Sequence, residues 1–323
     1  MTTLYVDDRY RGAHGIGRYA REVLPRLRPA WSSLKLDGSP HRPLDAFRRL
    51  PDVERSALVY SPGYGALVRS PRQVLTIHDL IHLRSAWPGR AKFAAYYAGP
   101  VRHVVRAAGV VVTVSETSAS DIRTWVRDDA VRVVNAGNGC SAAFRRDGAK
   151  DLHPDAYVAF VGNLRPHKNL DVVLRALAQT PGLRLRAVLP QREAAAGRGR
   201  AASLGIADRV EWLSDLGDER LAALYRGACA SVMPSIDEGF GLPALESISC
   251  GVPVLFWRGC AAVAEVVGDR GEALESPRDA EEWASALAAA ASSPRRVDPP
   301  ATADWNRTAG IVSDVLEQAL TDR

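Results

Sequence analysis

The sequence lacks any long hydrophobic run. No stretch approaches the roughly 18 uninterrupted apolar residues from which a membrane-spanning helix is inferred. The first eleven residues contain no apolar run behind a basic end, as a signal peptide would. We therefore expect neither a signal peptide nor a membrane span, and we expect a cytoplasmic protein.

Cysteine is scarce as well. The 323-residue chain holds four, Cys140, Cys229, Cys250 and Cys260. No two of them form the Cys-x-x-Cys spacing of many zinc and redox sites, and four thiols in a chain of this length do not resemble a disulfide framework. We expect them to be small buried core residues.

Compositional bias is also absent. Hydrophobic residues make up 46% and charged residues 24% of the chain, which is ordinary for a globular protein and excludes a disordered one. A chain of this length exceeds what one hydrophobic core usually serves, so two domains of about 150 residues are expected.

Charge is unevenly distributed along the chain. Residues 1–150 carry 24 Lys and Arg against 13 Asp and Glu, a net +11, whereas the remaining residues carry 18 against 24, a net −6. A basic half attracts acidic acceptors, anionic lipid head groups or nucleic acid. An ordinary solvated surface is an equal alternative, because 38 of the 42 cations are Arg and this usage can reflect genomic base composition. No DNA- or RNA-binding motif is present, so no nucleic-acid partner is expected.

Short β-branched runs alternate with longer amphipathic stretches, which is typical of parallel sheets flanked by helices. The expected strands are Leu4–Val6, Ala57–Tyr60, Val74–Ile77, Val110–Val114, Arg132–Val134, Tyr157–Val161, Leu183–Leu189, Arg209–Trp212, Ala230–Met233 and Val252–Phe256. The polar stretch 145–155 lacks periodicity and is interpreted as the linker. The pattern thus predicts an α/β protein with domains 1–150 and 151–303, followed by a separate final helix, 304–323, with Asp304 as its N-cap.

The most specific string is PSIDEGFGLPALE, from Pro234 to Glu246, directly after a predicted strand. Its glycines permit a tight turn and its second proline suits a first helical turn, so free amides there can bind an anionic or hydroxylated ligand. Glu238 is expected in the loop before the helix and Glu246 near the end of the first helical turn, so the two carboxylates point at different parts of an extended ligand and match one metal ion poorly. A capped helix with two exposed carboxylates is the structural alternative.

This string resembles the Glu-x7-Glu signature of glycosyltransferase family 4, with Glu238 and Glu246 at its ends. The segment Phe160 to Leu170, FVGNLRPHKNL, is similar to the family's strand, turn and helix that bind the donor diphosphate, with Arg165 and Lys168 as its cations. The resemblance implies a GT-B fold, in which two Rossmann-like, doubly wound domains face each other across a cleft. It also implies a retaining, metal-independent hexosyltransferase whose N-terminal domain binds the acceptor, whose C-terminal domain binds the nucleotide sugar and whose last helix packs back on the N-terminal domain.

Further donor contacts follow from the same resemblance. The implied residues are Gly162, Asn163, Leu213, Asp215, Phe240, Gly241 and Leu242. The base-binding stretch matches less closely, because Ser214 stands where relatives often carry Gly. Physical chemistry supports the role of the two cations, because negative charge grows on a departing nucleoside diphosphate and preorganised cations stabilise it.

The N-terminal half resembles a subgroup with a Gly-Ile-Gly-Arg-Tyr loop, here Gly15 to Tyr19, whose Gly15 and Gly17 are implied to approach the donor diphosphate. The same glycines, with Asp37 downstream, weakly match a dinucleotide fingerprint, so an NAD-dependent oxidoreductase is an alternative. Eight residues separate the predicted strand from Gly15, whereas the fingerprint needs its first Gly almost at once.

The resemblance also makes His78 the strand-end residue that contacts the donor sugar and helps to place the acceptor. His78 and His82 lie four apart, which a zinc hydrolase could use on a long helix, but a strand end and the lack of a third ligand argue against a metal. A structural role for His78 is the other alternative.

The implied reaction moves a hexose, with mannose from GDP-mannose favoured by the subgroup, to a glycan, lipid-linked or other anionic acceptor in polysaccharide synthesis. The donor's leaving diphosphate accepts the acceptor proton, so no protein nucleophile or cofactor is needed. A non-catalytic nucleotide-sugar binder remains an alternative, UDP and dTDP sugars remain open as donors, and so does peripheral contact with the inner membrane face.

Overall fold

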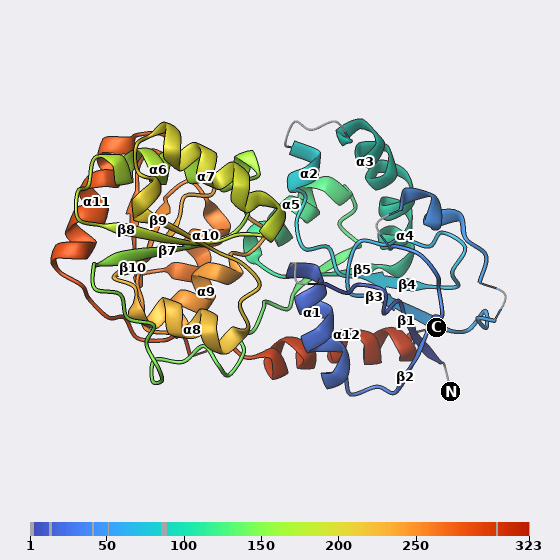
Figure 1. Cartoon of the computed structure of the whole chain (residues 1–323). Helices are drawn as coiled ribbons and strands as arrows, with labels where there is room; N and C mark the ends of the chain where they lie inside the picture. Colours follow the sequence, from blue (N-terminus) through green and yellow to red (C-terminus); the bar gives the residue numbers. More distant parts are fainter. Residues whose placement is uncertain are drawn as a thin grey trace. The chain divides into compact units, whose positions relative to one another are not determined.

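The alternating pattern forms two sets of parallel strands in the computed structural model (Figure 1). The structure describes residues 3–12, 15–40, 42–50, 52–84, 89–301 and 303–322. It divides into an N-terminal unit, Met1–Gly139 with Asp304–Arg323, and a C-terminal unit, Cys140–Ala303. The chain therefore leaves the first unit ahead of the polar stretch 145–155, which belongs to the second.

The N-terminal unit has a parallel four-stranded sheet in the order β2-β1-β3-β4, and a parallel pair, β5-β6. An isolated parallel bridge between Thr76 and Val112 joins the two. The strands are β1 (Leu4–Val6), β2 (Trp31–Ser33), β3 (Leu58–Ser61), β4 (Gln73–Leu75), β5 (Val110–Thr113) and β6 (Arg132–Asn135). The helices are α1 (Gly15–Val23), η1 (Leu24–Arg26), η2 (Pro43–Phe47), α2 (Ile81–Arg84), α3 (Arg90–Tyr96), η3 (Tyr97–Val101), α4 (Arg102–Ala108), α5 (Glu116–Val126) and α12 (Trp305–Thr321).

Helix α12 closes the N-terminal unit. Asp304 caps it, as the sequence predicts, by accepting a hydrogen bond from the Asn306 amide. The helix packs against α1, η1 and β3, and Arg28 pairs with both Asp314 and Glu317 on its outer face. Chain segments from opposite ends of the sequence thus share one hydrophobic core.

The C-terminal unit has a parallel six-stranded sheet in the order β12-β11-β10-β7-β8-β9. The strands are β7 (Tyr157–Val161), β8 (Arg184–Val188), β9 (Val210–Leu213), β10 (Ala230–Met233), β11 (Val254–Trp257) and β12 (Gly271–Leu274). The helices are η4 (Pro166–Lys168), α6 (Leu170–Ala178), η5 (Gln191–Glu193), α7 (Ala194–Ser203), η6 (Ala207–Arg209), α8 (Asp218–Gly227), α9 (Leu242–Ser249), α10 (Ala261–Val267) and α11 (Ala280–Ser292).

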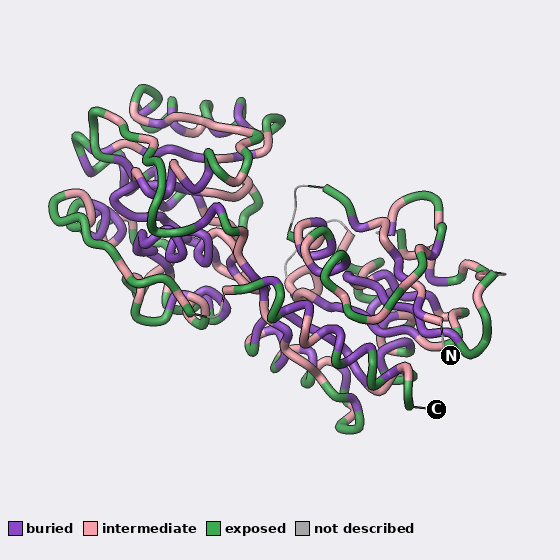
Figure 2. Tube along the Cα trace, turned by 90° about the horizontal axis from the view of Figure 1, so that it is seen from below, coloured by how far each residue is buried: buried purple, intermediate pink, exposed green. Residues whose placement is uncertain are grey.

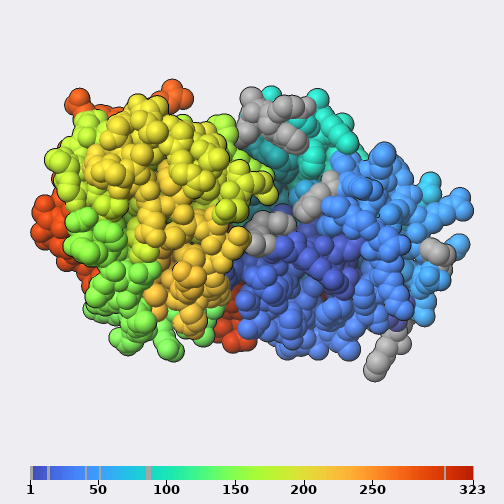
Figure 3. Space-filling view, in the orientation of Figure 1, coloured from blue at the N-terminus to red at the C-terminus, as the bar shows by residue number. Residues whose placement is uncertain are grey.

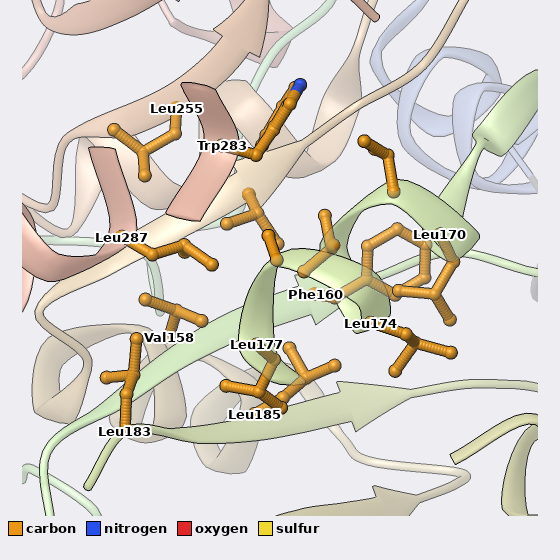
Figure 4. Close-up of a cluster of buried hydrophobic side chains, with 14 of the residues drawn as sticks. Val158, Phe160, Leu170, Leu174, Leu177, Leu183, Leu185, Leu255, Trp283 and Leu287 are labelled. Atoms are coloured by element: carbon orange, nitrogen blue, oxygen red, sulfur yellow. The ribbon is translucent and has the colours of Figure 1, made fainter. Parts of the chain in front are cut away.

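Both faces of this sheet are covered, and successive residues of β7 alternate between them. Val158 and Phe160 pack in the core beneath α6, α7 and α11, which also contains Trp283 (Figure 4). Tyr157 and Ala159 pack on the opposite face beneath α8. In each unit the buried stretches run through the interior and the exposed ones along the rim (Figure 2). In the space-filling view, the yellow segments around α7 and α8 make up much of the visible surface of the C-terminal unit (Figure 3).

A buried arginine fastens the start of the C-terminal unit to α8. Arg226 is 3% exposed, and its guanidinium donates to the carbonyl oxygens of Ala143, Arg145 and Ala149 at 2.7–3.2 Å. A buried cation needs such partners to offset its lost hydration. The polar stretch that sequence reasoning interprets as a linker is therefore held in place.

The cysteines follow the expectation in part. Cys229, Cys250 and Cys260 are buried, whereas Cys140 is partly exposed, and all four thiols are free. Among the described residues, no helix combines the length and the hydropathy that a membrane crossing requires.

Candidate functional site

Two loops of the C-terminal unit lie next to each other because their strands do. β7 pairs in parallel with β10, so the turns at their carboxyl ends emerge at the same edge of the sheet. The amide of Ile236 donates to the carbonyl oxygen of His167 at 2.7 Å, which ties the two turns together. The edge where ligands of such sheets bind is therefore built from the two segments that carry the strongest motifs.

The turn after β7 is held by hydrogen bonds on both sides. Gly162 donates its amide to Val188 of the neighbouring strand, and Leu164 donates its amide to the carboxylate of Glu193 at 2.6 Å. The side chain of Asn163 accepts from the amide of Arg165 at 3.1 Å. Arg165 itself is exposed, and its guanidinium makes no ion pair within the described part of the chain. The turn thus presents a cation without neutralising it.

Asn169 pins the same turn and was not assigned a role from the sequence. Its side-chain amide donates to the carbonyl oxygens of Pro234 at 3.1 Å and Pro277 at 2.6 Å. Its φ of +51° is a left-handed conformation that Asn tolerates better than most residues. An Asn between a 3-10 turn and a helix is the only local signal of this role.

Lys168 and Glu238 form an ion pair across the two turns. The Lys168 Nζ lies 2.5 Å from Glu238 Oε1, and the side chains are 15% and 11% exposed. In a salt bridge this sheltered, the attraction between the charges offsets the cost of removing them from water only when the geometry is good and further hydrogen-bond partners are present. The structure therefore brings together a cation and a carboxylate that sequence reasoning places on the donor.

Gly241 shapes the turn that leads into α9. Its φ is +101°, and an added Cβ would lie 3.3 Å from Val263 Cγ2 and 3.5 Å from Met233 Cε. A side chain is strained there by the backbone as well as by its neighbours. Phe240 precedes this glycine and Leu242 begins the helix, both partly buried.

Replacing Gly241 with Ala is expected to lower the free energy of unfolding by about 1–2 kcal/mol, because L-residues pay this in left-handed backbone. Gly199→Ala is the matched control: Gly199 lies within α7 and its added Cβ meets nothing within 4 Å, so a slight gain is expected. Urea unfolding of both variants measures the difference. Equal midpoints would contradict the strain at Gly241.

Glu246 is buried rather than at the mouth of its helix. It is 5% exposed, on the fifth residue of α9, and lies beside Tyr225 of α8. Burial, and next the charge of Glu246, raise the pKa of Tyr225 well above its ordinary value. The phenol therefore stays neutral beside Glu246, which lies in the second turn of α9.

Cys260 lies near the ion pair of Lys168 and Glu238, and no local sequence motif indicates this proximity. It caps α10 and is 2% exposed. Burial, followed by the nearby charge of Glu238, raises the pKa of this thiol to about 12. The thiol is therefore neutral and packs beside the acidic loop.

The residues expected near a nucleotide base lie two strands away from β7. Leu213 ends β9, which is the edge strand beyond β8, and its carbonyl accepts from the Leu189 amide. Asp215 follows with φ of +53°. The three sets of expected donor residues therefore occur along one edge of one sheet.

The expected residues of the N-terminal unit lie in α1 and after β4. Gly15 begins α1, and Gly17 packs so closely that an added Cβ would lie 2.5 Å from the Gly12 carbonyl oxygen. His78 stacks edge-on against Tyr19 with ring centroids 4.8 Å apart. Helix α1 therefore contacts His78 through Tyr19, two residues after the tightly packed Gly17.

The hydrogen bonds of His78 define its orientation. Its Nε2 lies 3.0 Å from the Pro62 carbonyl oxygen, and because a carbonyl only accepts, Nε2 carries the proton. The Ser118 hydroxyl donates to the His78 backbone carbonyl at 2.9 Å. The ring centroid of His82 lies 4.4 Å from that of Tyr97. No group of three His, Cys, Asp or Glu suited to a metal occurs within the described ranges.

Comparison with known families agrees with the motifs. The model of the family "Glycosyl transferases group 1" matches residues 144–307, which is half of the chain and includes both turns. The chain belongs to this family. The resemblance to glycosyltransferase family 4 is thereby confirmed.

Curated relatives of the family carry the name D-inositol 3-phosphate glycosyltransferase. One from Catenulispora acidiphila is 32% identical over 248 residues, which are 68% of this chain and 58% of the relative. One from Actinosynnema mirum is 40% identical over 158 residues, 44% of this chain and 38% of the relative. The match thus spans 58% and 38% of the length of these two relatives.

Solved structures of low identity show the fold. Sucrose-phosphate synthase from Thermosynechococcus elongatus has a TM-score of 0.72 at 19% identity, covering 99% of this chain and 95% of that one. HepE of Anabaena, solved with UDP-glucose, has a TM-score of 0.69 at 18% identity, with coverages of 99% and 94%. The predicted GT-B class, with two parallel α/β sheets, is confirmed.

Proposed function

We propose that this family member is a retaining glycosyltransferase that moves a hexose from a nucleoside diphosphate sugar to a hydroxyl group of its acceptor. The observation that carries the proposal is the sheet edge at which exposed Arg165 shares a turn with Lys168, whose sheltered ion pair joins it to Glu238 of the neighbouring turn. Family membership supports the reaction class.

The site suits a diphosphate leaving group. As the bond between the anomeric carbon and the diphosphate breaks, negative charge grows on the phosphate oxygens, and preorganised cations stabilise it. Arg165 offers a planar fork for two oxygens and Lys168 a point charge. Glu238, with the amides of Phe240 and Gly241, is proposed to hold the sugar hydroxyls, and Glu246 the ribose.

The acceptor attacks from the face that the diphosphate leaves, and a diphosphate oxygen takes the proton of its hydroxyl. One glycosidic bond forms as the sugar–phosphate bond breaks, so charge and atoms balance without an enzyme nucleophile. The N-terminal unit is proposed to bring the acceptor, with His78 beside the sugar and Gly15 and Gly17 near the diphosphate. Gly162, Asn163, Leu213, Asp215 and Leu242 are proposed to complete the donor contacts.

The substrates are proposed at the level of chemical class. Relatives are named for inositol 3-phosphate, so a phosphate-bearing polyol is a suitable acceptor class, and a structural neighbour was solved with UDP-glucose, so a UDP sugar is a suitable donor class. A glycan or lipid-linked acceptor remains a prediction. Mannose from GDP-mannose, which the Gly15–Tyr19 loop favours by resemblance, remains a prediction.

The proposal is tested by the stability that nucleotides add. UDP, GDP and dTDP are screened at high concentration, and the cognate nucleotide at a hundred times its dissociation constant should raise the free energy of unfolding by about 2.7 kcal/mol. NAD serves as the comparison for an oxidoreductase. A shift with NAD alone, or with none of the four, would contradict the proposed donor site.

Catalysis is separated from simple binding by donor hydrolysis. A transferase without acceptor is expected to release some sugar from its cognate nucleotide sugar to water, and the purified chain is assayed against UDP, GDP and dTDP sugars. Nucleotide binding with no release and no transfer to any polyol phosphate or glycan would indicate a non-catalytic binder.

A further inference from the structure

A hollow lies on the surface of the N-terminal unit, away from the residues assigned above. It has a volume of about 430 Å³ and is lined by Ala98, Gly99, Arg102, His103, Arg106 and Ala107. These residues belong to η3 and α4 (Figure 1). The proposed reaction uses none of them.

Local backbone structure explains the hollow. The helical stretch from Arg90 to Ala108 contains a π-helical segment, Tyr97–Val101, with Pro100 inside it. Proline lacks the amide for the regular α-helical bond, and π-segments occur frequently at functional sites. The small residues Ala98, Gly99 and Ala107 line the hollow. An added Cβ at Gly99 would meet nothing within 4 Å. The floor is therefore shallow and open.

The walls of the hollow are basic and rigid. The guanidinium of Arg102 lies 5.2 Å from the ring centroid of Trp125, a cation–π contact that fixes it. Arg106 donates to the carbonyl oxygens of Val126 and Arg127 at 2.7–3.2 Å, and its Nε lies 3.7 Å from Asp128 Oδ2. These contacts hold two guanidinium groups beside one lining histidine.

One donor in this wall is unsatisfied. The Nε of Arg102 is buried and has no hydrogen-bond acceptor in the portion of the chain that the structure describes. Leaving a buried donor without an acceptor is unfavourable, so this guanidinium lacks part of the compensation for its charge that a bound anion would supply. Burial, and then repulsion from Arg106 and Arg127, lower the pKa of Arg102, so its own surroundings disfavour its charge.

We propose that this hollow binds a phosphate group through Arg102, Arg106 and His103. Tetrahedral oxyanions match the donor fork of arginine, and the small floor residues leave room for the group carrying the phosphate. The phosphate can come from a soluble phosphomonoester or from a phospholipid head group. The chemistry of the contact is the same for both sources.

The test uses the full chain with sn-glycerol 3-phosphate by calorimetry, and with phosphatidylcholine vesicles, with or without phosphatidylglycerol, by co-sedimentation. Arg102→Gln removes the charged fork, and Gly99→Leu fills the floor without changing charge. Arg102→Gln is expected to weaken binding about 10-fold or more, as the loss of a charge-assisted hydrogen bond does. Gly99→Leu is expected to weaken it by a similar factor, because its side chain occupies the space of the ligand. Arg123→Gln, on the exposed face of α5, is the control with the same charge change and is expected to bind as the wild type does.

Each outcome decides the proposal. Binding of glycerol phosphate that both hollow variants weaken supports a soluble ligand, and vesicle binding that needs phosphatidylglycerol and follows the same variants supports a lipid head group. Absence of both in the wild type, or equal weakening by Arg123→Gln, overturns the proposal. Nucleotide stabilisation of the C-terminal unit is measured in parallel, so failure here is distinguishable from failure of the proposed transferase.

Discussion

Replacing Arg165 with Ala is expected to lower the rate of sugar transfer by about 10²–10³-fold, the usual loss when one preorganised charge donor is removed. The guanidinium is exposed and outside any ion pair of the described residues, so its removal leaves no buried carboxylate unpaired. The free energy of unfolding should therefore stay unchanged within about 0.5 kcal/mol. Steady-state kinetics with the cognate donor and urea unfolding measure the two quantities.

Arg175→Ala is the matched control for this variant. Arg175 is exposed near the last turn of α6, the helix that follows the turn containing Arg165, and its loss changes the net charge equally. A purely electrostatic effect of net charge would slow both variants alike. Turnover of Arg165→Ala near the wild-type rate would show that the assigned role is wrong.

The pair of Lys168 and Glu238 allows a test of charge against structure. Lys168→Met is expected to reduce transfer by about 10²–10³-fold. It also leaves Glu238 sheltered and unpaired, which costs about 3–5 kcal/mol of stability for a fully buried pair and less here, where both side chains keep some exposure. Kinetics alone would not separate the two losses.

The double variant Lys168→Met with Glu238→Gln separates them. Its two neutral side chains remove the unpaired charge, so stability should largely return, whereas transfer should stay low because the diphosphate still lacks a cation and the sugar lacks the Glu238 carboxylate. The unfolding free energies of the single and double variants give the coupling between the pair. If the double variant recovered both activity and stability, Lys168 would have a structural role only.

The interior strands were predictable because buried parallel strands are near-continuous hydrophobic runs. Tyr157–Val161 and Ala230–Met233 have the bounds that the sequence indicates. The strands β2 and β12 were missed: Trp31–Ser33 and Gly271–Leu274 lie at sheet edges and are strands through pairing with β1 and β11 rather than through their own pattern.

The candidate site was predictable only where chemistry is local in sequence. The cations after β7 and the acidic loop after β10 each follow a predicted strand, and the pairing of those strands brings Lys168 and Glu238 together. The contacts of Asn169 with Pro277 and of Tyr225 with Glu246 join segments far apart in sequence. Periodicity carries no information about such pairs.

Arg226 sets a rule for how this family member can be recombined with its relatives. A chimaera joined at residue 150 would take the guanidinium from one parent and its three acceptor carbonyls from the other, and any insertion or deletion between Ala143 and Ala149 would leave a buried cation without partners. A junction at Gly139 and Cys140, with the return at Ala303 and Asp304, keeps donor and acceptors in one inherited piece. The piece that can be exchanged as a unit therefore begins at Cys140, ahead of the polar stretch 145–155.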